Sequence, residues 1–349
     1  MQGILYSHGQ DHYALDPDLK AVLEAFAPGL PQEELSAFGR LVGEEVLEVA
    51  HHVDTLSPPR LLMHDLDGNR IDRALLSPAE RALLEKLRPM VRPAYEGRGW
   101  PLHYALGYLL ADGGLYCILT ITHQVAYALH KYAPEWEAVK RELLYGKAYG
   151  ATWMTEVQGG SDLGANRTLA RREGEAYRLY RGDKYFASGA GLADYALDTA
   201  RPEGAPEGPK GLALFLLPRE AEGRLNFRVR RFKEKLATRA VPSGEVELEG
   251  SLAYLLGRPE EGIYYTLETL TVARLANAVA AMGLAKKAHL EALFRVRRRT
   301  AFGRRLLDHD LVQHDLLEMR LRQVGRSEEH TSELQSQSNL VCRLLLEKK

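Results

Sequence analysis

The sequence predicts an α+β fold: a helical N-terminal region, a β-rich middle region and a helical C-terminal region. Three observations support this order. Apolar residues recur at three- and four-residue steps through the first 148 residues. Between Tyr149 and Leu256, apolar and polar residues alternate and Gly- and Pro-rich turns intervene, which predicts a small antiparallel β domain. From Glu260 the helical period returns in segments rich in Ala and Leu.

Composition narrows the class of protein. The chain has 349 residues, 45% of them hydrophobic, so it is long enough to bury a large core. Its net charge of −1 gives no general argument for nucleic-acid binding. Its two cysteines, Cys117 and Cys342, make neither a disulfide framework nor a metal site. Without a signal peptide or a bilayer-length apolar stretch, we expect a cytoplasmic protein with no metal and no membrane partner.

Apolar spacing and turn residues place the N-terminal elements. Met1–Pro17 is expected to be an irregular arm, and Asp67-Gly68-Asn69 is expected to form a turn. Ser77 with Pro78 predicts a capped helix start. The other helices are expected over Asp18–Phe26, Gln32–Val53, Leu102–Tyr132 with an interruption at Gly113-Gly114, and Pro134–Leu144.

The middle and C-terminal elements follow from the same signals. Arg167–Tyr180 alternates around Gly174-Glu175 and predicts a hairpin. Arg201–Lys210 predicts an exposed loop before a buried strand at Gly211–Leu217. Further strands are expected at Leu225–Arg231 and Val246–Glu249, and helices at Thr266–Arg299 and His309–Val324.

One segment, Met154–Asp162, reads Met-Thr-Glu-Val-Gln-Gly-Gly-Ser-Asp and opens the β region. Gly159 and Gly160 would let the backbone take positive φ and approach a ligand closely. Ser161 and Asp162 offer short side chains that bond to nearby backbone in a turn. Such a bend suits a ligand edge rich in hydrogen-bond acceptors, but these residues alone equally fit an ordinary glycine turn between strands.

Three segments together resemble one family. Met-Thr-Glu-x-x-Gly-Gly-Ser-Asp is similar to a signature of acyl-CoA dehydrogenases, and its Gln158-Gly159-Gly160 variant resembles the branch linked to the adaptive response to DNA alkylation. Gly182–Ser188 (Gly-Asp-Lys-Tyr-Phe-Ala-Ser) resembles the family's Gly-x-Lys-x-Trp-Ile-Thr. Arg299–Gly303 (Arg-Thr-Ala-Phe-Gly) resembles its Arg-x-x-Phe-Gly.

The resemblance implies a domain plan. It predicts an N-terminal helical domain over 1–148, a flavin-binding middle β domain over 149–256, and the first half of a C-terminal four-helix bundle over 257–325. Residues 326–349 resemble a translated sequencing adapter, and we expect them to be an artefactual tail. The bundle would then be incomplete.

The resemblance also implies a site for FAD. Thr155 and nearby amides, including that of Met154, would face the pyrimidine edge of the flavin, with Gly160 and Ser161 along the ribityl-pyrophosphate. Ser188 would bond at N5 beside Ala187, and Phe186 would pack on the ring system. The alternatives are a strand-end cap for Ser188 and a core aromatic for Phe186.

Six arginines form a basic cluster: Arg295, Arg297, Arg298, Arg299, Arg304 and Arg305. Three interpretations stay open for it, namely a solvated helix end, contact with the FAD of a neighbouring subunit, or contact with DNA phosphates. For Arg299 itself the resemblance favours the FAD pyrophosphate, with Phe302 near the adenine. Arginine suits this role because its planar fork binds phosphate bidentately.

The sequence offers no convincing base for the α-proton, so the catalytic residue is unknown. Some family members place a glutamate one residue before an arginine that matches Arg274, but Ala273 stands there. Glu268 is nearly two turns away and is expected to be a surface charge.

The resemblance predicts an FAD-dependent acyl-CoA dehydrogenase-like oxidoreductase acting on the CH–CH group of an acyl-CoA, assembled in the parent protein as a homo-oligomer, a tetramer. The alternative is a DNA-associated protective flavoprotein of the alkylation response with little dehydrogenase activity. The chain as given is expected to be inactive, flavin-poor and aggregation-prone, because bundle helices without partners would expose Leu306, Leu311, Leu316, Leu317 and Leu321.

Overall fold

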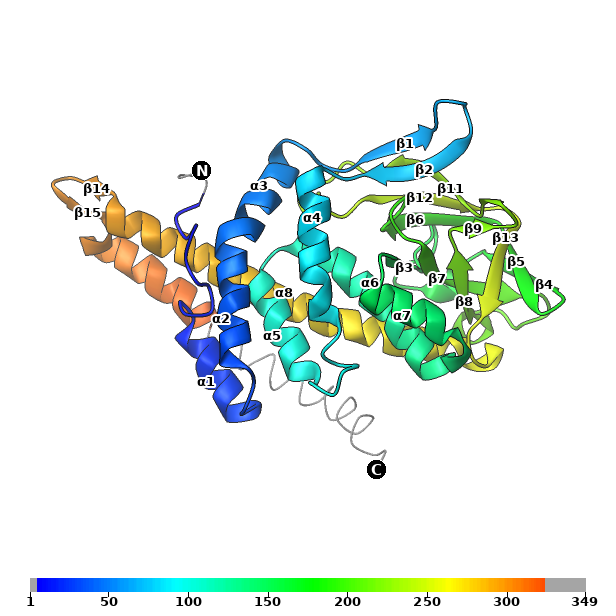
Figure 1. Cartoon of the computed structure of the whole chain (residues 1–349), viewed down its shortest axis with the longest axis horizontal. Helices are drawn as coiled ribbons and strands as arrows, with labels where there is room; N and C mark the ends of the chain where they lie inside the picture. Colours follow the sequence, from blue (N-terminus) through cyan, green and yellow to red (C-terminus); the bar gives the residue numbers. More distant parts are fainter. Residues whose placement is uncertain (1–4, 324–349) are drawn as a thin grey trace. The chain divides into compact units, whose positions relative to one another are not determined.

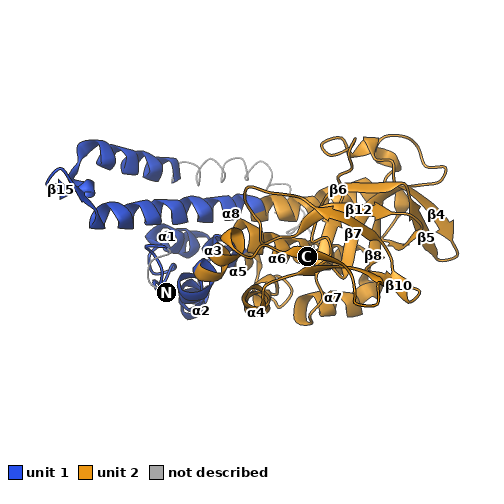
Figure 2. Cartoon of the chain, turned by 90° about the horizontal axis from the view of Figure 1, so that it is seen from above, with its two compact units in different colours: residues 1–47, 104–111, 277–349 blue, residues 48–103, 112–276 orange. Residues whose placement is uncertain are grey.

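Two units divide the chain (Figures 1 and 2), and a computed structural model describes residues 5–323 of it. Unit 1 draws on residues 1–47, 104–111 and 277–349, and unit 2 on residues 48–103 and 112–276. The adapter-like tail over 326–349 lies outside the described residues. Each unit is described by itself below.

The N-terminal part of unit 1 contains α1 (Pro17–Phe26) and α2 (Gln32–Leu41). Helix α2 continues through a π-helical turn (Val42–Val46) into α3 (Leu47–Thr55), which confirms one helical segment from Gln32 past Val53. The buried Asp16 connects several segments of this part. Its carboxylate caps α1 at the amide of Leu19 (3.0 Å), accepts the hydroxyl of Tyr108 (2.8 Å) and pairs with Lys286 (3.2 Å).

The C-terminal part of unit 1 contains the end of α8 (Gly262–Arg298), a hairpin of β14 (Thr300–Ala301) and β15 (Arg304–Arg305), and a helix over residues 310–323. Leu311, Leu317 and Leu321 are exposed on that helix, as expected, whereas Leu306 and Leu316 are half-buried. Among the helices within residues 5–323, none combines the length and the apolar character that a bilayer crossing requires.

The helices of unit 2 confirm the main predictions. Ser77 caps α4 (Pro78–Leu87) by accepting the amide of Glu80 (3.1 Å). The helix is interrupted at Ala111 and Asp112, between α5 (Trp100–Leu110) and α6 (Gly113–Tyr132), rather than at the expected Gly113-Gly114, which begin α6 after the Asp112 cap. Helix α7 (Glu137–Tyr145) follows.

A hairpin in unit 2 was missed. Strands β1 (Arg60–His64) and β2 (Arg70–Leu75) flank the expected turn at Asp67-Gly68-Asn69, but no strand was predicted there. Contacts distant in sequence hold the hairpin: the amide of Ala74 donates to Gly191 (2.8 Å), and buried Asp72 accepts the amide of Val229 (2.7 Å). The local sequence gives little indication of these two strands, because strand formation here depends on packing against distant residues.

The middle β domain contains two main sheets. The six-stranded sheet has the order β3-β7-β4-β5-β13-β8, and the pairing of β7 with β8 closes five of its strands into a ring. Its strands are β3 (Gly150–Trp153), β4 (Leu169–Glu173), β5 (Ala176–Tyr180), β7 (Tyr195–Pro202), β8 (Ala213–Pro218) and β13 (Ser251–Leu255). The three-stranded sheet has the order β11-β12-β6, with β11 (Arg228–Phe232), β12 (Ser243–Leu248) and β6 (Gly182–Ser188).

The strand pairing corrects one detail of the prediction. Most pairs are antiparallel, but β7 pairs in parallel with β3 and with β4. The domain is therefore mixed rather than wholly antiparallel, because β3 and β7 are joined by a long crossover that contains β4, β5 and β6. The fully buried Trp153 ties the two sheets, since its indole Nε1 donates to the carbonyl of Ser188 (2.9 Å).

Candidate flavin-binding site

The segments Met154–Asp162 and Gly182–Ser188 lie side by side in unit 2. The amide of Tyr185 donates to the carbonyl of Thr155 (3.0 Å), and Glu156 forms an isolated antiparallel bridge with Lys184. The end of β3 is thereby fixed beside β6. Two of the three family-like segments therefore form one surface within a single unit.

A buried ion triad locks this pairing. The Lys184 ammonium, which is fully buried, lies 3.0 Å from the Glu156 carboxylate and 2.7 Å from that of Asp198 on β7. Glu156 also accepts the amide of Arg167 (2.7 Å) and the hydroxyl of Thr168. Removing one partner of such a buried group leaves a charge uncompensated, so the triad strongly favours this one arrangement.

The two carboxylates of the triad differ in environment. Burial would raise the pKa of Glu156, but Lys184, Thr168 and the amide of Arg167 outweigh it and hold that pKa below its ordinary value. Asp198 has fewer donors, and burial raises its pKa to about 7 despite Lys184. Burial would lower the pKa of Lys184, but Asp198 and Glu156 together raise it. As pH falls below 7, Asp198 becomes protonated and Lys184 with Glu156 remains as the charge pair.

The glycines in Met154–Asp162 act differently from the expectation. Neither Gly159 nor Gly160 has positive φ. Gly159 is required for close packing instead, because a Cβ there would lie 2.3 Å from Oδ1 of Asn166. Asn166 in turn donates to the carbonyl of Met154 (2.7 Å). Asp162 makes the expected turn contact by accepting the amide of Gly164 (3.0 Å).

This packing leaves a set of donors along the loop. Thr155 is half-buried, and Gly160 and Ser161 are exposed. Within residues 5–323, neither the hydroxyls of Thr155 and Ser161 nor the amides of Gly160 and Ser161 make a hydrogen bond. They are available to the acceptor groups of a ligand.

Strand β6 places Phe186, Ala187 and Ser188 next to that loop. Phe186 is 55% exposed and Ala187 is fully buried, as the alternation of a strand requires. The core-aromatic interpretation of Phe186 is therefore wrong. Ser188 is half-buried and faces Ser243 of β12, with 3.4 Å between their Oγ atoms.

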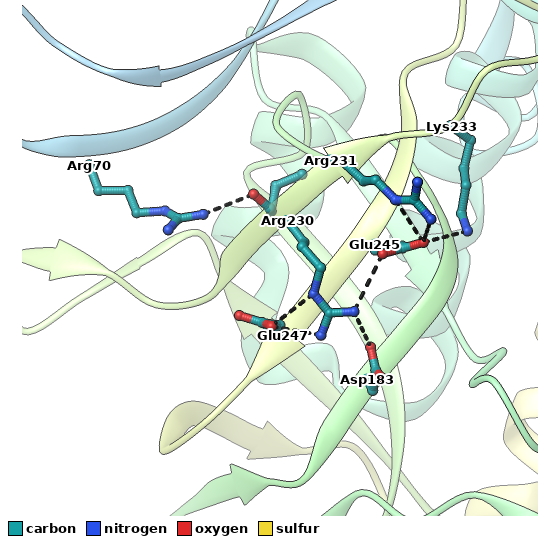
Figure 3. Close-up of polar contacts among 8 residues, drawn as sticks. Arg70, Asp183, Arg230, Arg231, Lys233, Glu245 and Glu247 are labelled. Carbon is teal, nitrogen blue, oxygen red and sulfur yellow. Dashed lines mark hydrogen bonds and ion pairs between the residues drawn. The ribbon is translucent and has the colours of Figure 1, made fainter.

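An ionic network around Glu245 (Figure 3) includes Lys233, whose ammonium also contacts the exposed Phe186 ring. Arg231 and Lys233 converge on Glu245, and those contacts lower the pKa of Glu245 to about 2. The Lys233 ammonium also lies over the rings of Tyr185 (3.2 Å) and Phe186 (4.9 Å). Cation–π contacts of this kind favour one ring orientation.

These features fit an isoalloxazine ring. That group is planar and aromatic, with acceptor atoms along one edge, and the structure offers an exposed phenyl face beside hydroxyl and amide donors. Met154 and Ala187 are buried, so they would contribute backbone rather than side-chain contacts.

The third family-like segment lies in unit 1. Arg299 is exposed where α8 ends, and Phe302 is 97% exposed at the tip of the β14–β15 hairpin, with φ of 51°. The amide of Leu306 donates to the carbonyl of Arg299 (2.8 Å) and closes the hairpin. The structure therefore does not bring these two residues together with the β-domain set within one unit.

Glu268 is not the simple surface charge that we expected. It is half-buried in unit 2 and accepts hydrogen bonds from Tyr127 (2.8 Å), Tyr132 and Lys131. Burial would raise its pKa, but these donors lower it. Three donors make this carboxylate a poor base. Ala273 and the exposed Arg274 lie one to two turns further along α8.

A second polar region lies at the other end of β6. A cavity of about 600 Å³ lies between Gly182 and β10 (Arg224–Leu225), and most of its charged residues already form ion pairs. Its lining includes Arg178, Arg181, Arg228, Arg230, Glu222, Glu247 and Glu249. Within residues 5–323, no group of three His, Cys, Asp or Glu side chains is arranged to hold a metal ion.

The ion triad went unrecognised at the level of sequence. Glu156 and Lys184 were part of the family-like segments, yet neither was assigned a role. The sequence feature that indicates such a triad is a charged residue inside an apolar strand, and the clearest case is Asp198 within Tyr195–Pro202. Full burial of such residues requires a partner.

Family models match almost the whole described chain. The N-terminal domain of the adaptive response protein AidB matches residues 6–150, the acyl-CoA dehydrogenase middle domain matches 151–251, and the acyl-CoA dehydrogenase C-terminal domain matches 260–325. The chain belongs to the acyl-CoA dehydrogenase family, with an N-terminal domain of the AidB type.

Curated relatives agree. The chain is 30% identical over 312 residues to acyl-CoA dehydrogenase family member 11 of Caenorhabditis elegans, an alignment covering 81% of this chain and 50% of that protein. It is 28% identical over 349 residues to the putative acyl-CoA dehydrogenase AidB of Escherichia coli K12, covering 90% and 61%. The chain thus spans half to three-fifths of the length of these relatives.

Solved structures show the same fold. The apo form of Bd2924 has a TM-score of 0.83 at 29% identity, covering 92% of this chain and 71% of that one. The Caenorhabditis elegans ACDH-11 structure in complex with C11-CoA has a TM-score of 0.81 at 29% identity, covering 90% and 57%.

Proposed function

We propose that this protein is an FAD-dependent oxidoreductase that acts on the CH–CH group of an acyl-CoA thioester. The observation that carries the proposal is the pairing of Met154–Asp162 with β6 through the Glu156–Lys184–Asp198 triad and the backbone bond from Tyr185 to Thr155 within one unit. The complex of the related ACDH-11 with C11-CoA supports an acyl-CoA as the substrate class.

In this proposal the chain's own residues bind and orient. Thr155 and the amides near Gly160 hold the acceptor edge of the flavin, and Ser161 binds along the ribityl-pyrophosphate. Ser188 donates at N5, and Phe186 packs on the ring system. Bound FAD supplies the chemistry, since it accepts the hydride from the β-carbon of the acyl group. Donors prearranged at the edge that becomes negative favour reduction, because they need no reorganisation.

Arg299 and Phe302 would complete the site from a neighbouring copy, through the pyrophosphate and the adenine of its FAD. The exposure of both side chains supports this assignment. A homo-oligomer, a tetramer in the parent protein, would then be required for full FAD affinity.

The test is to purify the protein expressed from the longest reading frame of the gene, add FAD, and follow absorbance and flavin fluorescence. We expect a saturable, yellow, quenched complex, followed by bleaching with a panel of acyl-CoAs in the same protein. A protein that ignores added FAD would overturn the proposal.

A second candidate function is that of a DNA-associated protective flavoprotein. The AidB-type N-terminal domain and the exposed arginines at the end of α8 favour it. Binding to DNA phosphates releases counterions, so log K should fall linearly with log salt. Binding that does not depend on salt, or no binding, would leave only the first candidate.

A further inference from the structure

A cluster at the end of β6 has no role in the function proposed above. The Lys235 ammonium donates to the hydroxyl of Ser243 (3.0 Å) and to the carbonyls of Val241 (2.6 Å) and Thr238 (2.7 Å). Ser243 is buried and pairs across strands with Ser188, with 3.4 Å between their Oγ atoms. The side chain of Ser188 also contacts the thiol of Cys117 on α6. All of these residues lie in unit 2.

The chemistry of lysine determines which group donates and which accepts in these contacts. An ammonium has three protons and no lone pair, so Ser243 must accept from Lys235. The proton of Ser243 is then directed to Ser188, or to the carbonyl of Val241 at 3.5 Å. In the first arrangement Ser188 accepts from Ser243, and its own proton remains available to a ligand. A positive charge at one end thereby strengthens the donor at the other end.

We propose that Lys235, through Ser243 and Ser188, is a positioning residue that makes reduction of the bound flavin more favourable. The inference rests on the proposed function, because it needs Ser188 at the flavin N5. The Ser243 hydroxyl on β12 joins the Lys235 ammonium to Ser188 on β6.

A cation near the flavin favours its reduction because reduction makes the flavin more negative. Uptake of a hydride, which carries two electrons and one proton, gives a neutral isoalloxazine one net negative charge. A cation nearby favours that charged form, as an opposite charge does for any ionising group, typically by about tenfold or more. Acyl-CoA supplies the hydride in the proposed reaction, and a chemical reductant supplies the electrons in the test.

Burial and the neighbouring groups shift the pKa of Lys235 in opposite directions. Burial lowers this pKa, and electrostatic attraction to Cys117 and Asp54 offsets only part of that shift. Asp54 on α3 is itself held by the amide of Arg239 (3.0 Å). Burial raises the pKa of Cys117, and Lys235 opposes this. The effect on the flavin should therefore decline as rising pH deprotonates Lys235, and that decline should begin below the usual titration range of a lysine.

A purely structural role is the competing explanation. Lys235 bridges two carbonyls of the loop before β12, where Thr238 has a φ of 55°. Ser243→Ala separates the two roles, since it cuts the link to Ser188 and leaves both carbonyl contacts of Lys235 intact.

The experiment measures the reduction potential of the FAD complex of the full chain against a reference dye. We expect Lys235→Gln and Ser243→Ala each to disfavour reduction roughly tenfold, a shift of about 30 mV to more negative values for a two-electron couple. Lys235→Arg should retain most of the potential. The exposed Lys210→Gln serves as the matched control and should leave it unchanged. An unchanged potential in either Lys235→Gln or Ser243→Ala overturns the inference.

A measurement without flavin separates this inference from the proposed function. In a Cys342→Ser background, the alkylation rate of Cys117 at pH 8 reports whether the charge of Lys235 reaches the Ser188 environment. Lys235→Gln should slow alkylation several-fold, because the thiolate loses a favourable charge. An unchanged rate contradicts the inference. Absence of FAD binding with a slowed rate would overturn the proposed function and the flavin role with it, but would leave the electrostatic link between Lys235 and the surroundings of Ser188 in place.

Discussion

The β domain of unit 2 and the helical end of unit 1 differ in how firmly their own contacts hold the family-like segments. In the β domain, three buried charges and a cross-strand backbone contact fix Thr155 beside Phe186 and Ser188. In unit 1, Arg299 and Phe302 project from a short hairpin. The first region is organised by its own contacts, whereas the second leaves its family-like side chains exposed.

The surfaces around the two regions show the same difference. The β-domain set is backed by a continuous core that includes Trp153, Phe215 and Val246. The helix over residues 310–323 leaves Leu311, Leu317 and Leu321 exposed. Exposed leucines on one helix are typical of an association surface. The comparison shows that the internally fixed segments and the exposed apolar helix belong to separate parts of the chain, and in our proposal the first orients the ligand and the second serves assembly.

The largest expected effect comes from Lys184→Met, which breaks the internal organisation of the β domain. Two buried carboxylates would lose their cation, so we expect the free energy of unfolding to fall by about 3–5 kcal/mol. Urea denaturation at pH 7 measures it. The exposed Lys210→Met is the control, with a change within about 0.5 kcal/mol. A loss below about 1 kcal/mol for Lys184→Met would contradict the role of the triad.

The pH dependence of the same pair of proteins sharpens the test. The lowered pKa of Glu156 gives stability that is present above its unfolded pKa and is lost as pH falls. The raised pKa of Lys184 gives stability that is present below its unfolded pKa and is lost as pH rises through the folded value. In Lys184→Met, the uncompensated carboxylates should make stability fall as pH rises above about 4, where they ionise when unfolded.

Ser188→Ala should have the next largest effect, on the flavin rather than on folding. It removes the donor proposed for N5, and loss of one such donor costs about 10²–10³ in rate in acyl-transfer sites. We expect weaker FAD binding or slower flavin reduction, followed by stopped-flow absorbance. Ser188→Thr keeps the hydroxyl and should behave like the original protein. Unchanged reduction in the alanine variant would remove Ser188 from the site.

Arg299→Ala tests the partner-dependent region. A charged hydrogen bond contributes about 1.5–3 kcal/mol, so FAD affinity should fall roughly 10- to 100-fold. The oligomer should weaken in parallel, since the arginine would bridge to a neighbour's cofactor. Analytical ultracentrifugation with and without FAD measures both, with the exposed Arg297→Ala as the control. FAD loss from an intact oligomer would indicate a contact within one subunit.

Lys233→Met should have the smallest effect. It removes the cation over Phe186 and Tyr185 and one partner of Glu245. Such cation–π contacts contribute about 0.5–1 kcal/mol, so FAD affinity should fall about two- to fivefold. Isothermal titration measures the change. Lys233→Arg keeps the charge and should restore affinity, and equal losses in both variants would mean that the charge has no role.

Much of the fold follows from local patterns. Helices with caps, such as those begun by Ser77 and Asp112, were predictable because the capping residue and the apolar period agree. The β1–β2 hairpin and the parallel partners of β7 were not, because distant contacts of Asp72 and a long crossover determine them.

In the candidate site, too, some residues could be predicted from sequence and others could not. Resemblance supplied Thr155, Phe186 and Ser188, and the structure shows why Phe186 stays exposed on its strand. The buried partners of Lys184 could not be paired from sequence, because Asp198 is 14 residues beyond it on another strand. The role of Gly159 was misjudged for a similar reason, since it reflects contact with the Asn166 side chain rather than backbone conformation.

The most direct test of the central claim is hydrogen–deuterium exchange of the 349-residue chain with and without saturating FAD. We predict that FAD slows exchange in peptides covering residues 154–162 and 185–188, which carry the proposed flavin contacts. The polar cavity lined by residues 221–230 should be unaffected and serves as the internal reference. Protection at residues 221–230 with none at 154–162 would contradict the assignment of the flavin to the paired segments of the β domain.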